Sequence, residues 1–438
     1  MSFWQKAIIC FGLIWGIGAQ AELRIDVSGA MSEPLPIAVP YFAGGETVTE
    51  MANNITDIIT SDLERSGLFR LVQREAYIQQ INGANERPRF PDWQAIQVHA
   101  LLHGQVEQDE NGQVKVSFRL WDVFAQKPME AKVMASEAGA WRKLAHMVAD
   151  TVYERITGET GYFDSQIVFV SESGEQKKRT KRLAIMDQDG ANFKYLSDGK
   201  EMALTPRFSP NMQKIAYFSY KNGDPKVYLM DLQSGETELV GRFDGMSFAP
   251  RFSPDGTQLL MSLAKNGNSD IFLYDLRTKA QKRLTNHPAI DTTPSFSPDG
   301  QKIVFSSDRG GNQQLYIMNK DGSGVKRISF GEGTYATPVW SPRGDYIAFT
   351  KIKAGLFNIG LMRPDGSGER LVADGFLVEG PTWSPNGRVL AFFKQIPWDQ
   401  RGKNGGVRLY SIDVTGHNEQ VFNTPEDGSS PAWSPLLH

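Results

Sequence analysis

Short stretches that combine serine with aspartate are the first groups in this sequence that could do chemistry. Residues 296–300 read FSPDG, and a serine beside a carboxylate could form a nucleophilic or metal-binding site if a base or further ligands joined it. Related stretches read SPNM, SPDG, SPRG and SPNG. A catalytic aspartate would not be replaced by arginine in an equivalent copy, whereas Pro, Asp, Asn and Gly are common residues of tight turns. We therefore interpret FSPDG as a turn.

Few other residues offer catalytic or metal-binding groups. His99 and His103 are four residues apart in an expected strand and so share a face, but two imidazoles are too few for a zinc site. Residues 187–190, DQDG, resemble part of a calcium loop, yet Asp-Gly turns occupy the same place in other copies of the repeat described below. The sequence lacks the GxSxG, HExxH and phosphate-loop motifs. We predict no catalytic residue, metal or cofactor.

The first 21 residues have the pattern of a secretory signal peptide. Lys6 precedes an apolar stretch that is too short for a comfortable membrane span, and Ala19-Gln20-Ala21 is a small-x-small cleavage site. Cleavage between Ala21 and Glu22 would export the chain to a periplasm and remove Cys10, its only cysteine. An N-terminal membrane anchor is the alternative. We expect the mature protein not to span a membrane. The net charge of the full chain, −3, argues against nucleic-acid binding.

A repeat organises the second part of the chain. A Pro-x-aromatic-Ser-Pro motif begins at residues 206, 250, 294, 338, 381 and 431. Three strand-like runs follow each of the first five copies, as in KIVFSS, QLYIMN and VKRIS. Counting the motif as a strand gives four strands per unit, which is typical of a β-propeller blade.

The ends of the repeat predict how the ring closes. Residues 165–197 read as a blade without its first strand, and the last motif, PAWSP, stands at the C-terminus. We expect this strand to complete the first blade, which gives a six-bladed propeller at residues 161–438 with no open edge. Strand direction then places the SPDG and Asp-Gly turns on one face, which the preceding domain enters. The other, variable face carries the longer loops and blade connections, where binding usually occurs.

Residues 22–160 lack the repeat. A short polar segment, 22–36, is expected to be flexible, and residues 37–160 to form an α/β domain. Helical periodicity predicts helices near 48–67 and 141–158, and apolar runs predict strands at 36–42 and 69–72. A hairpin around Asn111-Gly112 joins strands at 99–108 and 114–124.

Taken together, these features resemble the TolB family of the Tol-Pal system of Gram-negative bacteria. The resemblance covers essentially the whole chain: a leader ending Ala-Gln-Ala, the mature start ELRIDVSGA, the strand PIAVPYF, the α/β domain, the blade repeats and the terminal PAWSP. It implies a non-enzymatic periplasmic scaffold that supports outer-membrane integrity and envelope constriction during cell division. We expect a monomer.

The resemblance also implies partners. TolB proteins bind the lipoprotein Pal at the open propeller face, and their mature N-terminus binds the C-terminal domain of TolA, with the two interactions coupled. Other outer-membrane or peptidoglycan-associated proteins are further candidate partners. The predicted Pal-binding positions are Met246, Ala249, Thr292, Thr293, Tyr335, Thr337 and Glu379. The predicted TolA-binding segment comprises Glu22, Leu23, Arg24, Ile25, Asp26, Val27, Ser28 and Gly29.

Two other classes of function remain open from the residues. A periplasmic propeller hydrolase or lactonase would hold a metal in the channel through acidic or histidine ligands from several first strands. A carbohydrate- or peptidoglycan-binding module would use some of the nine tryptophans. Basic stretches at 177–182 and 397–406 are either solvated loops or a docking patch for an acidic partner.

Overall fold

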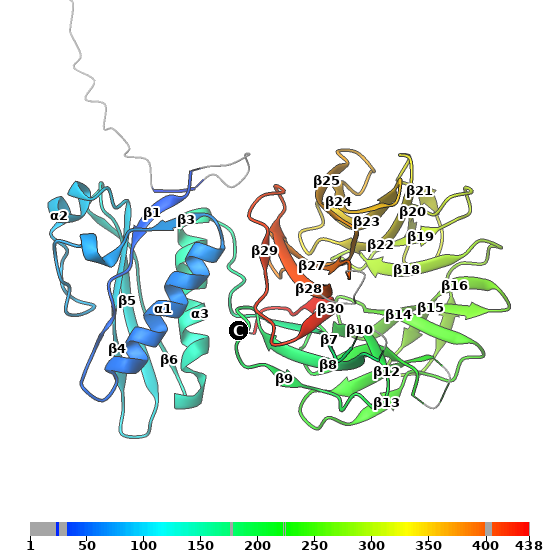
Figure 1. The fold of residues 1–438 in the computed structure, drawn as a ribbon, viewed down its shortest axis with the longest axis horizontal. Helices are drawn as coiled ribbons and strands as arrows, with labels where there is room; N and C mark the ends of the chain where they lie inside the picture. The colour runs from blue at the N-terminus through cyan, green and yellow to red at the C-terminus, as the bar shows by residue number, and fades with distance from the viewer. Residues whose placement is uncertain are drawn as a thin grey trace, which may run out of the picture.

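The computed structural model describes residues 23–25, 33–175, 178–221, 223, 225–398 and 405–437. These form an N-terminal α/β domain and a β-propeller that lie side by side, with the C-terminus between them (Figure 1). The expected signal peptide, with its cleavage site at Ala21 and Glu22, lies outside the described residues. No described helix is both long and apolar enough to cross a membrane.

The N-terminal domain is a mixed sheet with helices on both faces. Its strand order is β3-β1-β4-β5-β6, with β2 paired to β4. The strands are β1 (Leu35–Ala38), β2 (Ala43–Gly44), β3 (Phe69–Leu71), β4 (Ala100–Gln108), β5 (Val114–Asp122) and β6 (Lys127–Ser136). The helices are α1 (Thr49–Arg65), α2 (Phe90–Ala95) and α3 (Trp141–Thr157), with short 3-10 turns η1 (Arg74–Ala76) and η2 (Ala138–Ala140).

The long helices follow from their apolar spacing. Ile55, Ile59 and Leu63 of α1 lie on one face and are fully buried with the sheet and α3. The larger elements that escaped prediction are β6, an edge strand whose residues are mostly exposed or half-buried, and α2, which is too short to show a period. The ordered domain also begins two residues before the expected boundary at 37, because Leu35 and Pro36 pair with β3.

The propeller contains six four-stranded antiparallel sheets, as predicted. Blade 1 comprises β30 (Asp427–Trp433), β7 (Gln166–Ser173), β8 (Thr180–Asp187) and β9 (Lys194–Tyr195). Blade 2 comprises β10 (Ala203–Phe208), β11 (Lys214–Ser219), β12 (Lys226–Asp231) and β13 (Thr237–Leu239). Blade 3 comprises β14 (Met246–Phe252), β15 (Gln258–Lys265), β16 (Asn268–Asp275) and β17 (Gln281–Arg283).

The remaining blades repeat this order. Blade 4 comprises β18 (Asp291–Phe296), β19 (Lys302–Ser307), β20 (Gln314–Asn319) and β21 (Lys326–Arg327). Blade 5 comprises β22 (Thr334–Trp340), β23 (Ile347–Lys353), β24 (Leu356–Met362) and β25 (Arg370–Gly375). Blade 6 comprises β26 (Leu377–Trp383), β27 (Val389–Ile396), β28 (Gly406–Asp413) and β29 (Gln420–Val421).

The C-terminal strand closes the ring. β30 runs antiparallel to β7, with Trp433 opposite Ile167 and Asp427 opposite Glu172. The Trp433 indole donates a hydrogen bond to Ser165 Oγ at 2.8 Å. The first blade is thus built from both ends of the propeller sequence, as the position of PAWSP predicts.

The repeated motif joins strands one and two of each blade as a turn. In blade 4, Gly300 N donates to Ser297 O at 2.8 Å, and Ser297 Oγ accepts from Lys302 N at 2.9 Å. The aromatic residue before the serine packs between blades: Trp340 of blade 5 lies in one cluster with Val304 and Ile317 of blade 4. FSPDG therefore has a structural role.

Candidate binding face and interdomain junction

A ring of bulges surrounds the central channel. In every first strand the pairing register shifts at the residue before the motif proline. These residues have left-handed φ values of 47° to 68°: Thr205, Ala249, Thr293, Thr337, Gly380 and Ser430. Five of them are not glycine, so the backbone there is strained.

The bulge residues line one cavity of about 140 Å³ at the variable-face end of the channel. Four predicted Pal-binding residues meet there, namely Ala249, Thr293, Thr337 and Glu379. They come from four different blades, and the equal spacing of the repeat is what brings them together.

The other predicted face residues lie elsewhere. Met246 and Thr292 are half-buried beside the cavity lining, in β14 and β18. Tyr335 is fully buried, and its hydroxyl donates to Glu369, with oxygen separations of 2.8 and 2.9 Å. Tyr335 therefore supports this face from beneath, because its side chain is not presented to solvent.

Three charged side chains line the channel cavity. Arg207 and Arg251 belong to neighbouring blades 2 and 3, and Glu379 belongs to blade 6, opposite blade 3. Burial raises the pKa of Glu379 and lowers the pKa of Arg251 to about 10. A channel metal would need several acidic or histidine ligands, whereas the described lining supplies this one carboxylate. The geometry does not favour a metal-dependent hydrolase.

Exposed apolar side chains occur on the loops and blade connections of the same face. Phe330 and Phe376, which precede β22 and β26, have 72% and 58% of their surface exposed. We call the set that lies on the loops and blade connections of this face the apolar rim: Met202, Tyr220, Ile290, Phe330, Leu356 and Phe376. Sequence reasoning missed these residues, although Phe330 and Phe376 are large apolar residues in expected connections.

The described part of the N-terminal segment is docked, not free. Ile25 is buried in the N-terminal core, and its N–H donates to Ile156 O of α3 at 3.0 Å. Leu23 packs partly buried against the same core, and Arg24 is exposed. The remaining predicted TolA-binding residues, Glu22, Asp26, Val27, Ser28 and Gly29, lie outside the described residues.

The two domains meet on the turn face, which leaves the variable face open as expected. Arg343 of an SPRG turn binds Glu159 through two contacts of 2.8 Å, and Asn386 of the SPNG turn donates to Thr160 O at 2.8 Å. Asn418 of blade 6 donates to Arg65 O at 2.8 Å. The contacts tie blades 5 and 6 to the end of α1 and to the interdomain linker.

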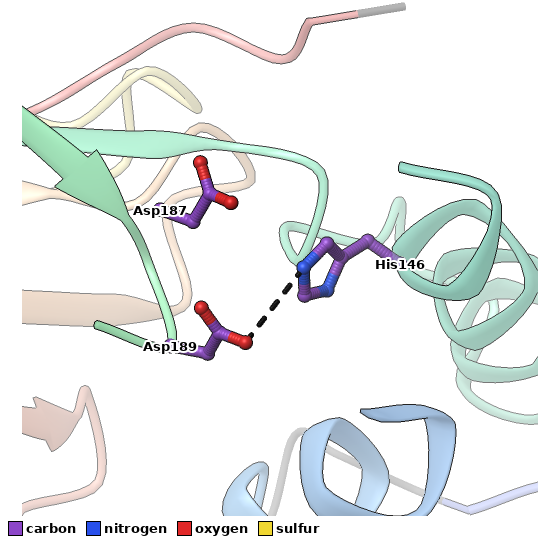
Figure 2. Close-up of side chains that lie close together, drawn as sticks. All are labelled: His146, Asp187 and Asp189. Carbon is purple, nitrogen blue, oxygen red and sulfur yellow. Dashed lines mark ion pairs between the residues drawn. The ribbon is translucent and has the colours of Figure 1, made fainter. Parts of the chain in front are cut away.

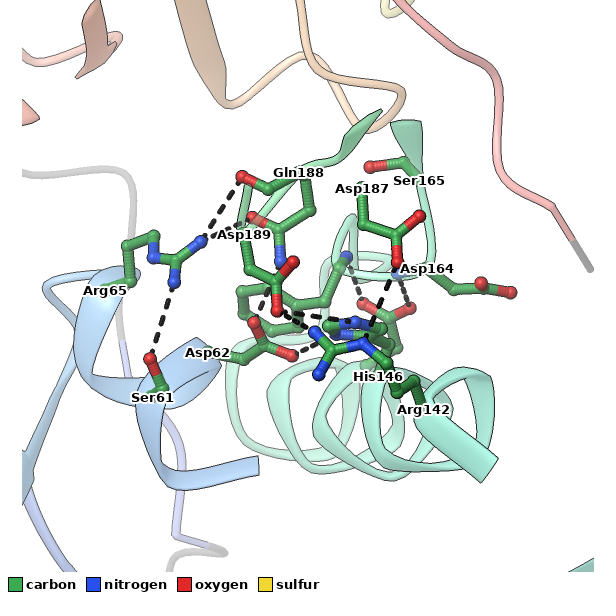
Figure 3. Close-up of polar contacts among 12 residues, drawn as sticks. Ser61, Asp62, Arg65, Arg142, His146, Asp164, Ser165, Asp187, Gln188 and Asp189 are labelled. Carbon is green, nitrogen blue, oxygen red and sulfur yellow. Dashed lines mark hydrogen bonds and ion pairs between the residues drawn. The ribbon is translucent and has the colours of Figure 1, made fainter. Parts of the chain in front are cut away.

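A buried polar network completes the junction at blade 1 (Figure 3). Asp62 of α1 is fully buried and accepts from His146 Nδ1 at 2.6 Å and from Gln188 Nε2 at 2.8 Å. Gln188 also accepts from Arg65, and Arg142 of α3 pairs with Asp189. Residues 187–190 thus form a turn, as interpreted, and its side chains join the propeller to both long helices.

His146, Asp187 and Asp189 form the tightest cluster of metal-ligand types among the described residues (Figure 2). Their ligand atoms lie within 4.8 Å of one another, with His146 Nε2 at 3.9 Å from Asp189 Oδ2. Arg142 pairs with Asp189 and approaches Asp187 at 3.9 Å, so a protein cation already meets these carboxylates. We interpret the cluster as an ion-pair network.

Electrostatics support a charged His146. Burial alone would lower the pKa of His146, but the charge of Asp62 and the hydrogen bond to it, helped by Asp189, raise it to about 8. Burial would likewise raise the pKa of Asp189, whereas the hydrogen bond from Ala191 N and the charges of His146 and Arg142 lower it. The positive imidazole therefore links α3 to carboxylates of α1 and the propeller.

His99 and His103 do not form a metal site. Burial lowers the pKa of His103 to about 4, although the bond to Gly83 O opposes this shift. Its Nε2 accepts from the Trp121 indole at 2.9 Å, so its Nδ1 donates to Gly83 O at 3.1 Å. His99 packs edge-on against Phe124. His103 is a neutral structural histidine.

The described parts of the basic loops are largely paired. Arg179 binds Glu172 and Asp427 of blade 1 and lies 5.7 Å from the ring centre of Trp398 of blade 6. Lys181 binds Glu172 at 3.1 Å. Lys177 and residues 399–404 lie outside the described residues. The described basic side chains pair with acidic groups of nearby strands or lie against the neighbouring blade. This arrangement does not favour a free basic patch.

Comparison with known proteins supplies the family. The model of the TolB amino-terminal domain matches residues 23–129, and that of the TolB beta propeller domain matches residues 153–437. The chain is 64% identical over 430 residues to the Tol-Pal system protein TolB of Paramagnetospirillum magneticum, covering 98% of this chain and 96% of that protein. The crystal structure of TolB from Acinetobacter baumannii superposes with a TM-score of 0.81 at 28% identity, covering 94% of this chain and 100% of that one. Together with the fold, these matches show that the chain belongs to the TolB family of Tol-Pal system proteins.

Proposed function

We propose that this chain is a non-enzymatic interaction scaffold of the periplasm. It binds Pal through the variable propeller face and the C-terminal domain of TolA through its mature N-terminus. These contacts support outer-membrane integrity and envelope constriction during division. Export by the expected signal peptide and the Tol-Pal system name of a 64% identical relative support this setting.

The apolar rim is the observation that carries the Pal proposal. Large exposed apolar side chains gathered on one face mark protein-binding sites, and aromatic residues commonly dominate the affinity of such interfaces. Phe330 and Phe376 are the two most exposed aromatics of the rim. The N-terminal domain lies on the opposite face, so a partner reaches the rim unobstructed. Met246, Ala249, Thr292, Thr293, Thr337 and Glu379 lie at the centre of the proposed face, with Tyr335 beneath it.

A matched pair of double variants tests this face. F330D/F376D places two charges in the rim and should weaken Pal binding by at least tenfold, since a buried aromatic anchor contributes about 2 kcal/mol or more. L371D/V421D introduces the same charges at exposed positions on the outer strands β25 and β29. Titration calorimetry with purified Pal measures both affinities. Equal affinities for the two variants would place the Pal site elsewhere.

The N-terminal segment is proposed to reach TolA by leaving its docked position. Release exposes the apolar side chains of Leu23 and Ile25 and breaks the hydrogen bond from Ile25 N to Ile156 O, and the freed extended segment can add to a partner sheet. If Pal favours the docked state, TolA binding weakens Pal binding to the same degree. Deletion of residues 22–33 should abolish TolA binding and spare Pal. Unchanged TolA affinity in that deletion would refute the assignment.

A further inference from the structure

The propeller channel contains a positively charged side chain that lacks an ion-pair partner among the described residues. Among the described residues, the guanidinium of Arg251 has no hydrogen-bond or ion-pair partner. It lines both the cavity of about 140 Å³ on the variable-face side and a second cavity of about 490 Å³ on the turn-face side. Arg251 therefore lies between the two halves of the channel. Arg251 is half-buried, and its partial loss of hydration in the channel lowers its pKa to about 10.

A second arginine lines the channel at the same level of the repeat. Arg207 occupies the equivalent position in the neighbouring blade and lines the same two cavities. Its Nη1 donates to Pro206 O at 2.6 Å and to Pro431 O at 3.4 Å, which holds the guanidinium against the channel wall. The equivalent positions of the six blades contain no acidic residue: Arg207, Arg251, Ser295, Val339, Thr382 and Ala432. This level of the channel is thus positively charged.

We propose that the channel binds a carboxylate at Arg251, with Arg207 contributing the second positive charge. A charge that has lost part of its hydration is stabilised by an opposite charge, and the planar guanidinium matches a carboxylate through two parallel hydrogen bonds. The smaller cavity opens toward the variable face, so the carboxylate is either a small free acid or an acidic side chain of the docked partner. An acidic side chain of the partner rests on the proposed function, whereas a small free acid does not.

Glu379 is the one acidic residue of the smaller cavity, and it opposes anion binding there. It belongs to blade 6, across the ring from Arg251, and in the described structure it forms no ion pair with either arginine. A carboxylate at Arg251 therefore does not displace an existing salt bridge. Neutralising Glu379 should strengthen anion binding, since it removes a like charge from the same low-dielectric space.

Acetate binding to the full mature chain tests the proposal. Ionic strength is held constant throughout the titration with sodium chloride. Titration calorimetry and the shift of the Arg251 side-chain NMR signal should show saturable binding. R251Q should weaken it by roughly tenfold or more, as expected for a lost charged hydrogen bond, and E379Q should strengthen it. R277Q removes an exposed arginine from the turn face and is the control for net charge.

Pal affinity separates the two sources. A weaker Pal complex in R251Q, but not in R277Q, assigns the carboxylate to the partner, and acetate binding with unchanged Pal affinity assigns the site to a free acid. Wild-type protein that binds acetate but not Pal would support the site and refute the proposed function. If acetate does not bind and R251Q leaves Pal affinity unchanged, the carboxylate site is wrong.

Discussion

At the scale of single residues, the two buried histidines of the N-terminal domain differ in charge because their hydrogen-bond partners differ. His103 lies between an indole donor and a backbone carbonyl, and burial holds it neutral. His146 is as deeply buried but contacts the carboxylate of Asp62, which outweighs the burial. Neither state could be predicted from the sequence, because Asp62 and His146 are 84 residues apart.

The raised pKa of His146 predicts a loss of stability in mild alkali. The folded pKa of about 8 exceeds the unfolded value of about 6.5, so protonated His146 stabilises the fold fully below pH 6.5, and this contribution is lost as pH rises through 8. The difference corresponds to about 2 kcal/mol in the free energy of unfolding. Denaturant unfolding should show the gap between wild type and H146Q shrinking by that amount from pH 6 to 9.

Two further measurements distinguish the effect of the His146 charge from indirect effects of the substitution on folding. H417Q changes an exposed histidine and should follow the wild-type pH profile. NMR titration of the His146 ring in the unmutated protein reads its pKa directly, whatever the variant does to folding. A His146 pKa at or below 6.5 would contradict the charged junction.

At the scale of elements, the six copies of the repeat share a backbone conformation at the bulge, although the residue type there differs. The residue before each motif proline has a left-handed φ, although its type is Thr, Ala, Gly or Ser. Glycine adopts this conformation without strain, whereas other residues incur about 1 kcal/mol. Five blades therefore retain strain at the bulge that shapes the channel mouth. The sequence pattern located these positions, but only the pairing register showed the bulge.

A pair of alanine-to-glycine changes tests the strain. A249G relieves a left-handed alanine, and this gain should offset or exceed the entropy cost of glycine, so stability stays equal or rises by up to about 1 kcal/mol. A264G lies in β15, outside the set of left-handed residues, and should lose about 0.5–1 kcal/mol. Thermal and denaturant unfolding compare the two. Equal losses in both variants would mean that the bulge is unstrained.

At the scale of the whole molecule, distant parts of the chain close the propeller and attach the N-terminal domain to it. The last strand completes the first blade, and the buried cluster of the N-terminal domain continues through Tyr162 and Phe163 to Trp433. The Asp187–Gly190 turn connects blade 1 to α1 and α3. Closure of the ring and docking of the domain therefore depend on the same blade.

Removal of β30 should open the ring. A chain ending at residue 426 removes the β30 partner from one edge of β7, whose other edge stays paired with β8, and deletes the buried Trp433, a loss that by itself costs about 3–5 kcal/mol. We expect the propeller to lose cooperative unfolding in calorimetry, and a peptide of residues 427–438 to restore it in part. A chain ending at residue 435 keeps all of β30 and serves as the control. Cooperative unfolding at the wild-type temperature in the shorter chain would argue against closure by this strand.

The sequence by itself determined the blade count, the closing strand and the open face, because these follow from local turn chemistry and regular spacing. It also located four residues that meet at the channel mouth. Only the tertiary structure revealed the edge strand β6, the burial of Tyr335, the apolar rim, the unpaired Arg251 and the charge of His146. Each of these depends on which distant groups surround a side chain and exclude water from it, and one-dimensional spacing contains no such information.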